Sequence, residues 1–468
     1  MIKNSIVNGL GLTVPILAAI LCIPPLFAAL GEVQAGLLLI IWAIVNSSAL
    51  LDFGLGRALT FHLAKSRNDE ASYHMVGVAF WLAVVIGTGF GALLFLFSGS
   101  VAAHLGDAAN ALAFQAIAWS APFIIATSVL RGILEAKRQF LLINAIRIPT
   151  GTLNFVAPLL VVWLLRPDNE LIAWSLTLGR ILTFFLFLFF ARRSAPYSLW
   201  RIKSMSGSAM LVTSGGWMTI SNMAGPALNL VERLVIGGQL SLSFVTTYAM
   251  PQEIVSRLSI IPNAISIALF PELANNLLDR TELSRIYVNC LGAVLVLIAA
   301  PTLAIILFAH EILTLWMGAS FAEASSFALQ VFAVGGLAGA LAQIPFVLIQ
   351  ARGDAKFTGT LHLVEVAVVS LALVVAVASW SLAGALAIWL TRCILDAAAL
   401  FLRARKFAQL SFGRESASKI LLLAVTLACI PLTWTDSLLP RVAALVLVTS
   451  LSAVSAIALL RSRTRESI

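Results

Sequence analysis

Several charged side chains lie inside stretches of this sequence that are apolar enough to cross a lipid bilayer. Asp52 and Arg57 fall in one such stretch, and Arg180 falls near the middle of another. A charged side chain at the centre of a spanning helix costs about 3 kcal/mol to insert, so these groups are expected to face the protein interior or a water-filled cavity. Arginines placed there would suit phosphate oxygens, because a guanidinium keeps its charge and donates two parallel hydrogen bonds.

A later apolar stretch carries amides and an arginine on one helical face. Asn222, Asn229 and Arg233 follow one another at spacings of seven and four residues. Lipid cannot satisfy these groups, so the face is expected to line a cavity or to pack against another helix. The asparagines could also only bridge helices, and Arg233 could extend its head to the outer interface.

Acid–arginine pairs occur in two further stretches. Glu253 precedes Arg257 by four residues, which is the favoured order for a pair on one helix, and Arg392 precedes Asp396 by the same spacing. Either pair could take part in transport or could only hold helices together.

Two acids have no obvious partner in their own helix. These are Asp52 and Glu365, and the lack of a partner favours a titrating role. His362 shares a helical face with Glu365 and could carry a proton or be a hydrogen-bonded structural group. Arg57 could alternatively extend its long side chain to the cytoplasmic interface.

The charges inside the predicted spans cancel, so the sequence does not establish a cationic lumen. Five arginines and five acids lie there, namely Arg57, Arg180, Arg233, Arg257 and Arg392, and Asp52, Glu232, Glu253, Glu365 and Asp396. An anionic substrate is favoured by residue type, since arginine holds its charge whereas a desolvated acid can take up a proton.

The composition identifies an integral membrane protein. The chain has 468 residues, of which 60% are hydrophobic and only 11% charged, and its mean hydropathy is +1.00. Apolar stretches of about 20 residues, the length that spans a bilayer, recur about fourteen times, and a close pair of them lies over residues 357–378 and 381–402. The four cysteines lie in apolar stretches without metal-ligand spacing and are expected to be packing residues. No metal and no cofactor are expected.

Basic residues are concentrated in every second connecting loop, and this pattern predicts which side of the membrane each loop faces. Nearly all loop arginines and lysines fall on the side that also carries both termini, which the positive-inside rule makes cytoplasmic. The net charge of +9 follows from this topology, and nucleic-acid binding is not expected because the charge is spread over short loops. No loop is long enough for a soluble catalytic domain, which argues against an enzyme.

Basic breaks divide the predicted helices into groups of six, six and two. The expected domains are a six-helix lobe over residues 1–200, a second over 201–409, and two added helices over 410–468. The loops near 130–140 and 349–357 resemble each other at equivalent places in the two lobes. Paired lobes with a substrate site between them are a recurrent transporter plan.

Several motifs resemble those of the bacterial polysaccharide flippases of the Wzx type, within the superfamily of multidrug, oligosaccharidyl-lipid and polysaccharide exporters. The motifs, in chain order, are Asp52-Phe-Gly-Leu-Gly-Arg57-Ala-Leu-Thr60, Leu130-Arg-Gly-Ile-Leu-Glu-Ala136, Trp217-Met-Thr-Ile-Ser-Asn222, Glu232-Arg233, Tyr248-Ala-Met-Pro-Gln-Glu253 and Gly353-Asp354 with His362 and Glu365. Glu232 stands where the family commonly has an aspartate.

The resemblance implies an all-α membrane protein with two six-helix lobes in a V shape and alternating access. Its substrate would be an undecaprenyl-diphosphate-linked oligosaccharide, with H+ or Na+ as the coupling ion. Carried over by position, the lumen arginines would be Arg57 and Arg257, with Arg233 nearer the periplasmic mouth. The candidate site residues are then Arg57, Arg257, Arg233, Arg180, Asn222 and Asn229 for substrate, and Asp52, Glu253, Glu365 and His362 for ion coupling.

Two other functions stay open at this point. A multidrug or toxin exporter would share the architecture but would need acids without arginine partners, and a membrane-embedded polymerase or ligase is disfavoured by the short loops. The expected location is the cytoplasmic membrane, with membrane lipids as surroundings. A monomer is expected, and an association with polysaccharide assembly proteins is left open.

Overall fold

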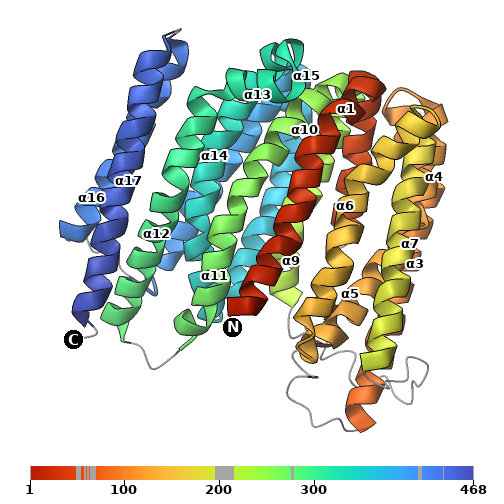
Figure 1. Cartoon of the computed structure of the whole chain (residues 1–468), viewed down its shortest axis with the longest axis horizontal. Coiled ribbons are helices and arrows are strands. Elements are labelled where there is room, and N and C mark those ends of the chain that lie inside the picture. Colours follow the sequence, from red (N-terminus) through yellow and green to blue (C-terminus); the bar gives the residue numbers. More distant parts are fainter. Residues whose placement is uncertain are drawn as a thin grey trace. The chain divides into compact units, whose positions relative to one another are not determined.

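The computed structural model describes residues 2–48, 54–56, 59–60, 63, 70–194, 216–275, 279–408, 414–435 and 437–466. All regular elements in these ranges are helices (Figure 1). Ten of these helices are long and apolar enough to cross a membrane, so the predicted all-α membrane fold is confirmed, whereas the predicted number of fourteen spans is not. Asp52 and Arg57 lie outside the described residues.

The chain forms two compact units, Met1–Thr246 and Thr247–Ile468. The predicted lobe boundaries near residues 200 and 409 both fall in segments outside the described ranges, so the division into six, six and two helices stays a prediction. The last helix of the first unit, α9 (Gly216–Gln239), packs against α1 (Ile2–Ser48).

The first unit is a bundle whose helices bury apolar faces against one another. Its other helices are α3 (Glu70–His104), α4 (Ala111–Ala118), α5 (Ala121–Ala136), α6 (Phe140–Leu164) and α7 (Asn169–Ser194), with a short 3₁₀ helix over Ala108–Asn110. α1 packs along α6, and α7 packs against α4, α5 and α6. More than half of the residues of α5 are buried, and Val129 and Leu130 belong to the same core cluster as Leu55 and Leu59.

The second unit centres on α12 and α14. Its helices are α10 (Leu242–Ser256, which begins in the first unit), α11 (Ile260–Leu273), α12 (Arg280–Leu307), α13 (Ala309–Met317), α14 (Ala319–Ala351), α15 (Ala355–Ala404), α16 (Arg414–Ala428) and α17 (Leu438–Glu466), with 3₁₀ helices over Arg257–Ser259 and Ile430–Trp434. α14 packs against α11, α12, α13 and α15, and α16 and α17 pack on α12.

The 50 residues of α15 are two helices folded back on each other. Ser381 has φ 55° and ψ −141°, which no helix accommodates. A straight helix would separate His362 from Asp396 by about 50 Å, yet their side chains are 3.4 Å apart. Gly384 lies so close to the first half that an added Cβ would be 2.1 Å from the carbonyl oxygen of Ala376. α1 is likewise broken, at Gly31 (φ 74°, ψ 167°).

The two loops that resemble each other in sequence have the same backbone geometry. α5 ends at Ala136 and α14 at Ala351, and each is followed by a residue with positive φ two positions later, Arg138 (56°) and Gly353 (82°). The amides of Gln139 and Asp354 both donate to the carbonyl five residues earlier, as in a Schellman cap. The short sequence match therefore marks one helix ending that occurs in both units.

Replacing Gly353 with alanine should lower the free energy of unfolding by about 1 kcal/mol, because a Cβ strains a left-handed residue. No atom of the described part of the chain lies within 4 Å of the position of that Cβ, so a clash with these residues is excluded. The measurement is thermal unfolding of the purified protein in detergent. Gly339→Ala in α14 is the matched control, since its helical backbone has equal room for a methyl group, and it should not destabilise.

Candidate functional site

Four charged or titratable side chains meet between the two halves of α15. His362 Nε2 lies 3.4 Å from Asp396 Oδ1, with the two side chains 14% and 17% exposed. Arg392 Nε lies 3.6 Å from Glu365 Oε2, with 18% and 12% exposed. The intrahelical Arg392–Asp396 pair considered from the sequence is replaced by these two cross-helix pairs. The reason is the turn at Ser381, which puts a closer partner opposite each group.

The α15 cluster, defined as His362, Glu365, Arg392 and Asp396, has a formal charge of −1 when the imidazole is neutral, from two carboxylates and one guanidinium. All four side chains are largely shielded from water. Binding of one proton or one monovalent cation would bring this formal charge to zero and so lower its desolvation cost. Phe346 stacks on the His362 ring with a centroid distance of 5.7 Å and an interplanar angle of 15°, which limits the positions of that ring.

The same cluster has the donors of a cation site. One ligand atom each from His362, Glu365 and Asp396 lies within 4.8 Å of the others. Two carboxylates and an imidazole could hold a metal ion. Arg392, however, places a fixed positive charge beside Glu365, and this disfavours a divalent ion more than a proton or a monovalent ion.

Arg392 and Asp396 were not among the predicted site residues, although the sequence holds a signal for them. Glu365 precedes Ser381 by 16 residues and Asp396 follows it by 15. In two antiparallel helices that meet near Ser381, these residues lie at the same depth. Counting equal numbers of residues from Ser381 along the two halves therefore predicts that Asp396 lies beside Glu365.

The predicted Glu253–Arg257 pair is present in the second unit. Arg257 Nη2 lies 3.1 Å from Glu253 Oε2, and the side chains are 48% and 30% exposed. Arg257 begins the 3₁₀ helix between α10 and α11, and Pro251 lies inside α10 just before it. A 3₁₀ segment within a long helix often marks a hinge. The arginine is thus accessible and forms an ion pair with one half-buried acid.

Arg233 is almost completely buried in the first unit. It is 2% exposed, and its Nη1 donates to the carbonyl oxygen of Leu39 in α1 at 2.7 Å. The head of this residue therefore does not extend to the outer interface, which was the alternative considered from the sequence. In this conformation Arg233 joins α9 to α1, and a substrate-binding role for it stays a prediction.

Among the other predicted residues of the first unit that the structure describes, Arg180 also lies at a helix contact. Arg180 Nη2 donates to Asn154 Oδ1 at 2.9 Å and so joins α7 to α6. Asn222 and Asn229 are half-buried on α9. Roles for these three in substrate binding remain predictions.

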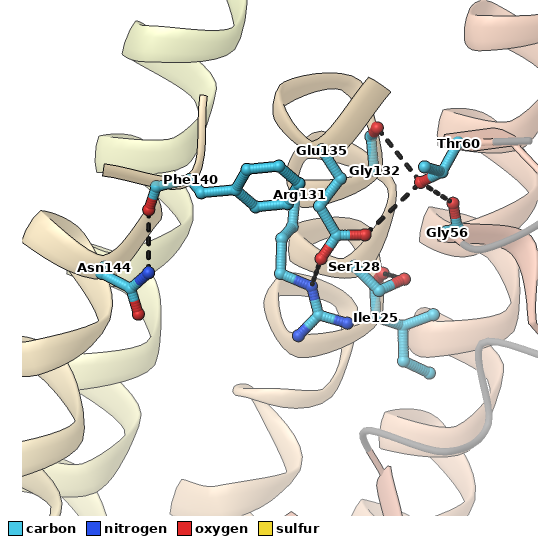
Figure 2. A network of polar contacts seen from close by, with 9 residues as sticks. All are labelled: Gly56, Thr60, Ile125, Ser128, Arg131, Gly132, Glu135, Phe140 and Asn144. Atoms are coloured by element: carbon cyan, nitrogen blue, oxygen red, sulfur yellow. Dashed lines mark hydrogen bonds and ion pairs between the residues drawn. The ribbon is translucent and has the colours of Figure 1, made fainter. Parts of the chain in front are cut away.

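A polar network fastens the segment around Gly56 to the end of α5 (Figure 2). The Thr60 hydroxyl is 2.9 Å from the carbonyl oxygen of Gly56, 3.2 Å from that of Gly132 and 3.4 Å from Glu135 Oε2. Arg131 Nε lies 3.3 Å from the second oxygen of Glu135. A Cβ on Gly132 would stand 2.6 Å from the Gly56 oxygen. The two sequence motifs that contain Gly56 and Gly132 thus contact each other. The sequence did not predict this contact.

A cavity of about 790 Å³ lies at the other end of the first unit. Its polar lining includes His104, Asp107, Asp168 and Glu170, and the His104 ring packs so closely on Gly238 that a Cβ there would be 2.0 Å from Nε2. None of the predicted site residues that the structure describes is among those that line it.

Comparison with known proteins places the chain in a family. The sequence matches the polysaccharide biosynthesis protein family over residues 34–326, more than half of its length. A candidate O-antigen transporter of Shigella flexneri is 29% identical over 404 residues, which are 85% of this chain and 96% of that protein.

Solved structures show the same fold at low sequence identity. The lipid II flippase MurJ in an inward closed conformation aligns with a TM-score of 0.74 at 13% identity, covering 99% of this chain and 100% of that one. An inward-facing multidrug resistance MATE transporter of the MOP superfamily aligns with a TM-score of 0.67 at 14% identity, covering 85% and 97%. The chain therefore belongs to the polysaccharide biosynthesis protein family and has the fold of the MOP-superfamily transporters.

Proposed function

We propose that this protein flips an undecaprenyl-diphosphate-linked oligosaccharide from the cytoplasmic to the periplasmic leaflet of the cytoplasmic membrane. The observation that carries the proposal is the match to a candidate O-antigen transporter along 96% of that protein. The membrane orientation is the one that places both termini and the arginine-rich loops in the cytoplasm.

The physical task is to carry a charged diphosphate and its sugars across about 30 Å of hydrocarbon. The polyprenyl tail can stay in lipid, so only the polar head needs a path through protein. Arg257 suits the diphosphate because it is about half exposed and paired with a single acid. Arg57 is its proposed partner, and Arg233, Arg180, Asn222 and Asn229 are proposed as further substrate contacts.

Ion coupling is proposed to reside in the α15 cluster. Its formal charge of −1 becomes zero when one H+ or Na+ binds, so occupancy by the ion changes the electrostatic energy of the packed helix pair. Glu365 and His362 would bind the ion, with Asp396 as their neighbour. Asp52 and Glu253 are proposed as additional coupling acids.

The structure favours this proposal over a multidrug cation exporter, the second candidate. A cation pump needs an acid whose charge is free for an organic cation. Glu365 instead has Arg392 at 3.6 Å, and Glu253 has Arg257 at 3.1 Å. Both of these acids are thus already engaged by an arginine.

Arg257→Gln should lower the flipping rate about tenfold to a hundredfold. A hydrogen bond to a charged group contributes about 1.5–3 kcal/mol, and each 1.4 kcal/mol is a factor of ten in rate. The fold should be unaffected, because an exposed i,i+4 pair contributes only about 0.3–0.5 kcal/mol. The measurement uses proteoliposomes containing a lipid-linked oligosaccharide, with the fraction that becomes accessible to an added glycosidase followed over time.

Arg166→Gln is the matched control for this experiment. It also removes an exposed arginine paired with one acid, Asp168 at 2.8 Å, and it should flip at the wild-type rate. Unchanged flipping by Arg257→Gln would rule out the proposed grip on the diphosphate. Wild-type protein that flips no lipid-linked oligosaccharide but exports organic cations would establish the exporter instead.

A further inference from the structure

An exposed apolar stripe runs along one face of α7 and ends at two arginines. Its members recur every three or four residues and are each at least 39% exposed, namely Trp174, Leu178, Leu182, Phe185 and Phe189. The stripe is about 22 Å long at 1.5 Å per residue. Arg192 and Arg193 follow Phe189 by three and four residues, so they lie at the same end of the same face.

The arginine end of the stripe is hollowed. A cavity of about 500 Å³ is lined by Phe185, Leu188, Phe189, Arg192 and Arg193. Its aromatic walls are held by neighbouring rings, with Phe189 edge-on to Phe190 at 5.1 Å and Phe185 edge-on to Phe184 at 5.3 Å. The result is an apolar hollow with two guanidinium groups at its rim.

These two arginines differ from several other arginines at or next to helix ends. Arg257, Arg403 and Arg441 each form an ion pair with an acid. Within the described ranges, neither Arg192 nor Arg193 has an ion pair or a side-chain hydrogen bond, and both are exposed. Their position in the last turn of α7 suits the helix dipole, but that partial charge cannot balance two full positive charges.

We propose that this hollow binds an anionic phospholipid of the cytoplasmic leaflet. The phosphate would lie between Arg192 and Arg193, each of which can donate two parallel hydrogen bonds to it. One acyl chain would lie against Phe189 and Phe185 and continue along the stripe. Basic hollows on the cytoplasmic side of membrane proteins bind anionic headgroups in this way. This site faces outward on α7, and it is separate from the residues proposed to move the oligosaccharide.

The test is native mass spectrometry of the purified full-length protein with a mixture of phosphatidylglycerol and phosphatidylcholine. The wild type should retain phosphatidylglycerol preferentially. The R192Q/R193Q variant should lose that preference by about tenfold or more, because each basic residue near a membrane surface contributes about 1 kcal/mol to binding an anionic lipid. The R192K/R193K variant keeps both charges and should keep most of the preference.

Two matched measurements make the result specific. Arg166→Gln removes a paired arginine from the loop that precedes α7 and should leave the lipid preference unchanged. The glutamine variant should still flip the oligosaccharide, since the proposed lipid site is independent of the proposed function. Equal retention of phosphatidylglycerol by the wild type and R192Q/R193Q would overturn the proposal, as would complete displacement of the lipid by millimolar inorganic phosphate.

Discussion

Arg233→Met should destabilise the protein by about 1.5–3 kcal/mol, the usual contribution of a hydrogen bond made by a charged group. The guanidinium is 2% exposed and donates to the Leu39 carbonyl across the α9–α1 contact. Methionine leaves that carbonyl without this donor. It also removes the positive charge that follows Glu232 in the sequence, and Glu232 is itself 1% exposed. The expected result is a large fall in thermal unfolding temperature and in the amount of protein recovered from the membrane.

A double variant separates the electrostatic cause from loss of packing. If the uncompensated Glu232 carboxylate is responsible, Glu232→Gln combined with Arg233→Met should recover much of the lost stability, because neutral replacement of buried charges is often tolerated. Wild-type stability of Arg233→Met together with loss of flipping would contradict this prediction. That outcome would support the role predicted from the sequence, in which Arg233 binds substrate.

The sequence predicts the fold class well because the physics behind it is local. Composition and the length of apolar stretches depend only on the bilayer as solvent, and they identify an all-helical membrane protein. The break between residues 378 and 381 was also found from the sequence, since two spans were predicted over 357–378 and 381–402. The structure confirms it with the non-helical Ser381.

Side-chain pairing is predicted less well, because periodicity identifies a helical face and not the helix that it contacts. Arg392 and Asp396 have the spacing of an intrahelical pair, but the structure pairs them with Glu365 and His362 of the other half. The Glu253–Arg257 pair has the same spacing and does form. The difference is that a facing helix offers Arg392 another acid, and sequence spacing contains no information about facing helices.

The buried charges of the two units are balanced differently. In the first unit Arg233 and Arg180 donate to a carbonyl and an amide oxygen, and such contacts hold helices in place without titrating. In the second unit the α15 cluster has one acid more than its fixed positive charge. A group that must take up a cation to become neutral responds to pH or to an ion gradient, whereas a satisfied arginine does not. We therefore propose that ion coupling resides in α15.

Glu365→Gln should abolish the dependence of flipping on the coupling ion. The substitution changes the formal charge of the α15 cluster from −1 to zero, so the cluster no longer needs a proton or Na+ to become neutral. For one ion exchanged per substrate, a tenfold ion gradient supplies about 1.4 kcal/mol and can shift the distribution of substrate up to about tenfold. Wild-type proteoliposomes should show this shift, and Glu365→Gln should show none while still equilibrating substrate between leaflets.

Glu323→Gln is the control for that substitution, because it removes an exposed acid of α14 outside the cluster and should leave the response to the gradient intact.

His362→Gln tests the contribution of the imidazole to the same cluster. It keeps both carboxylates and Arg392, so the charge stays at −1 and the response to Na+ should survive, while a response that depends on a proton held by the imidazole should weaken. A gradient response that is unchanged in Glu365→Gln would mean that coupling resides in other acids, with Glu253 the first to test.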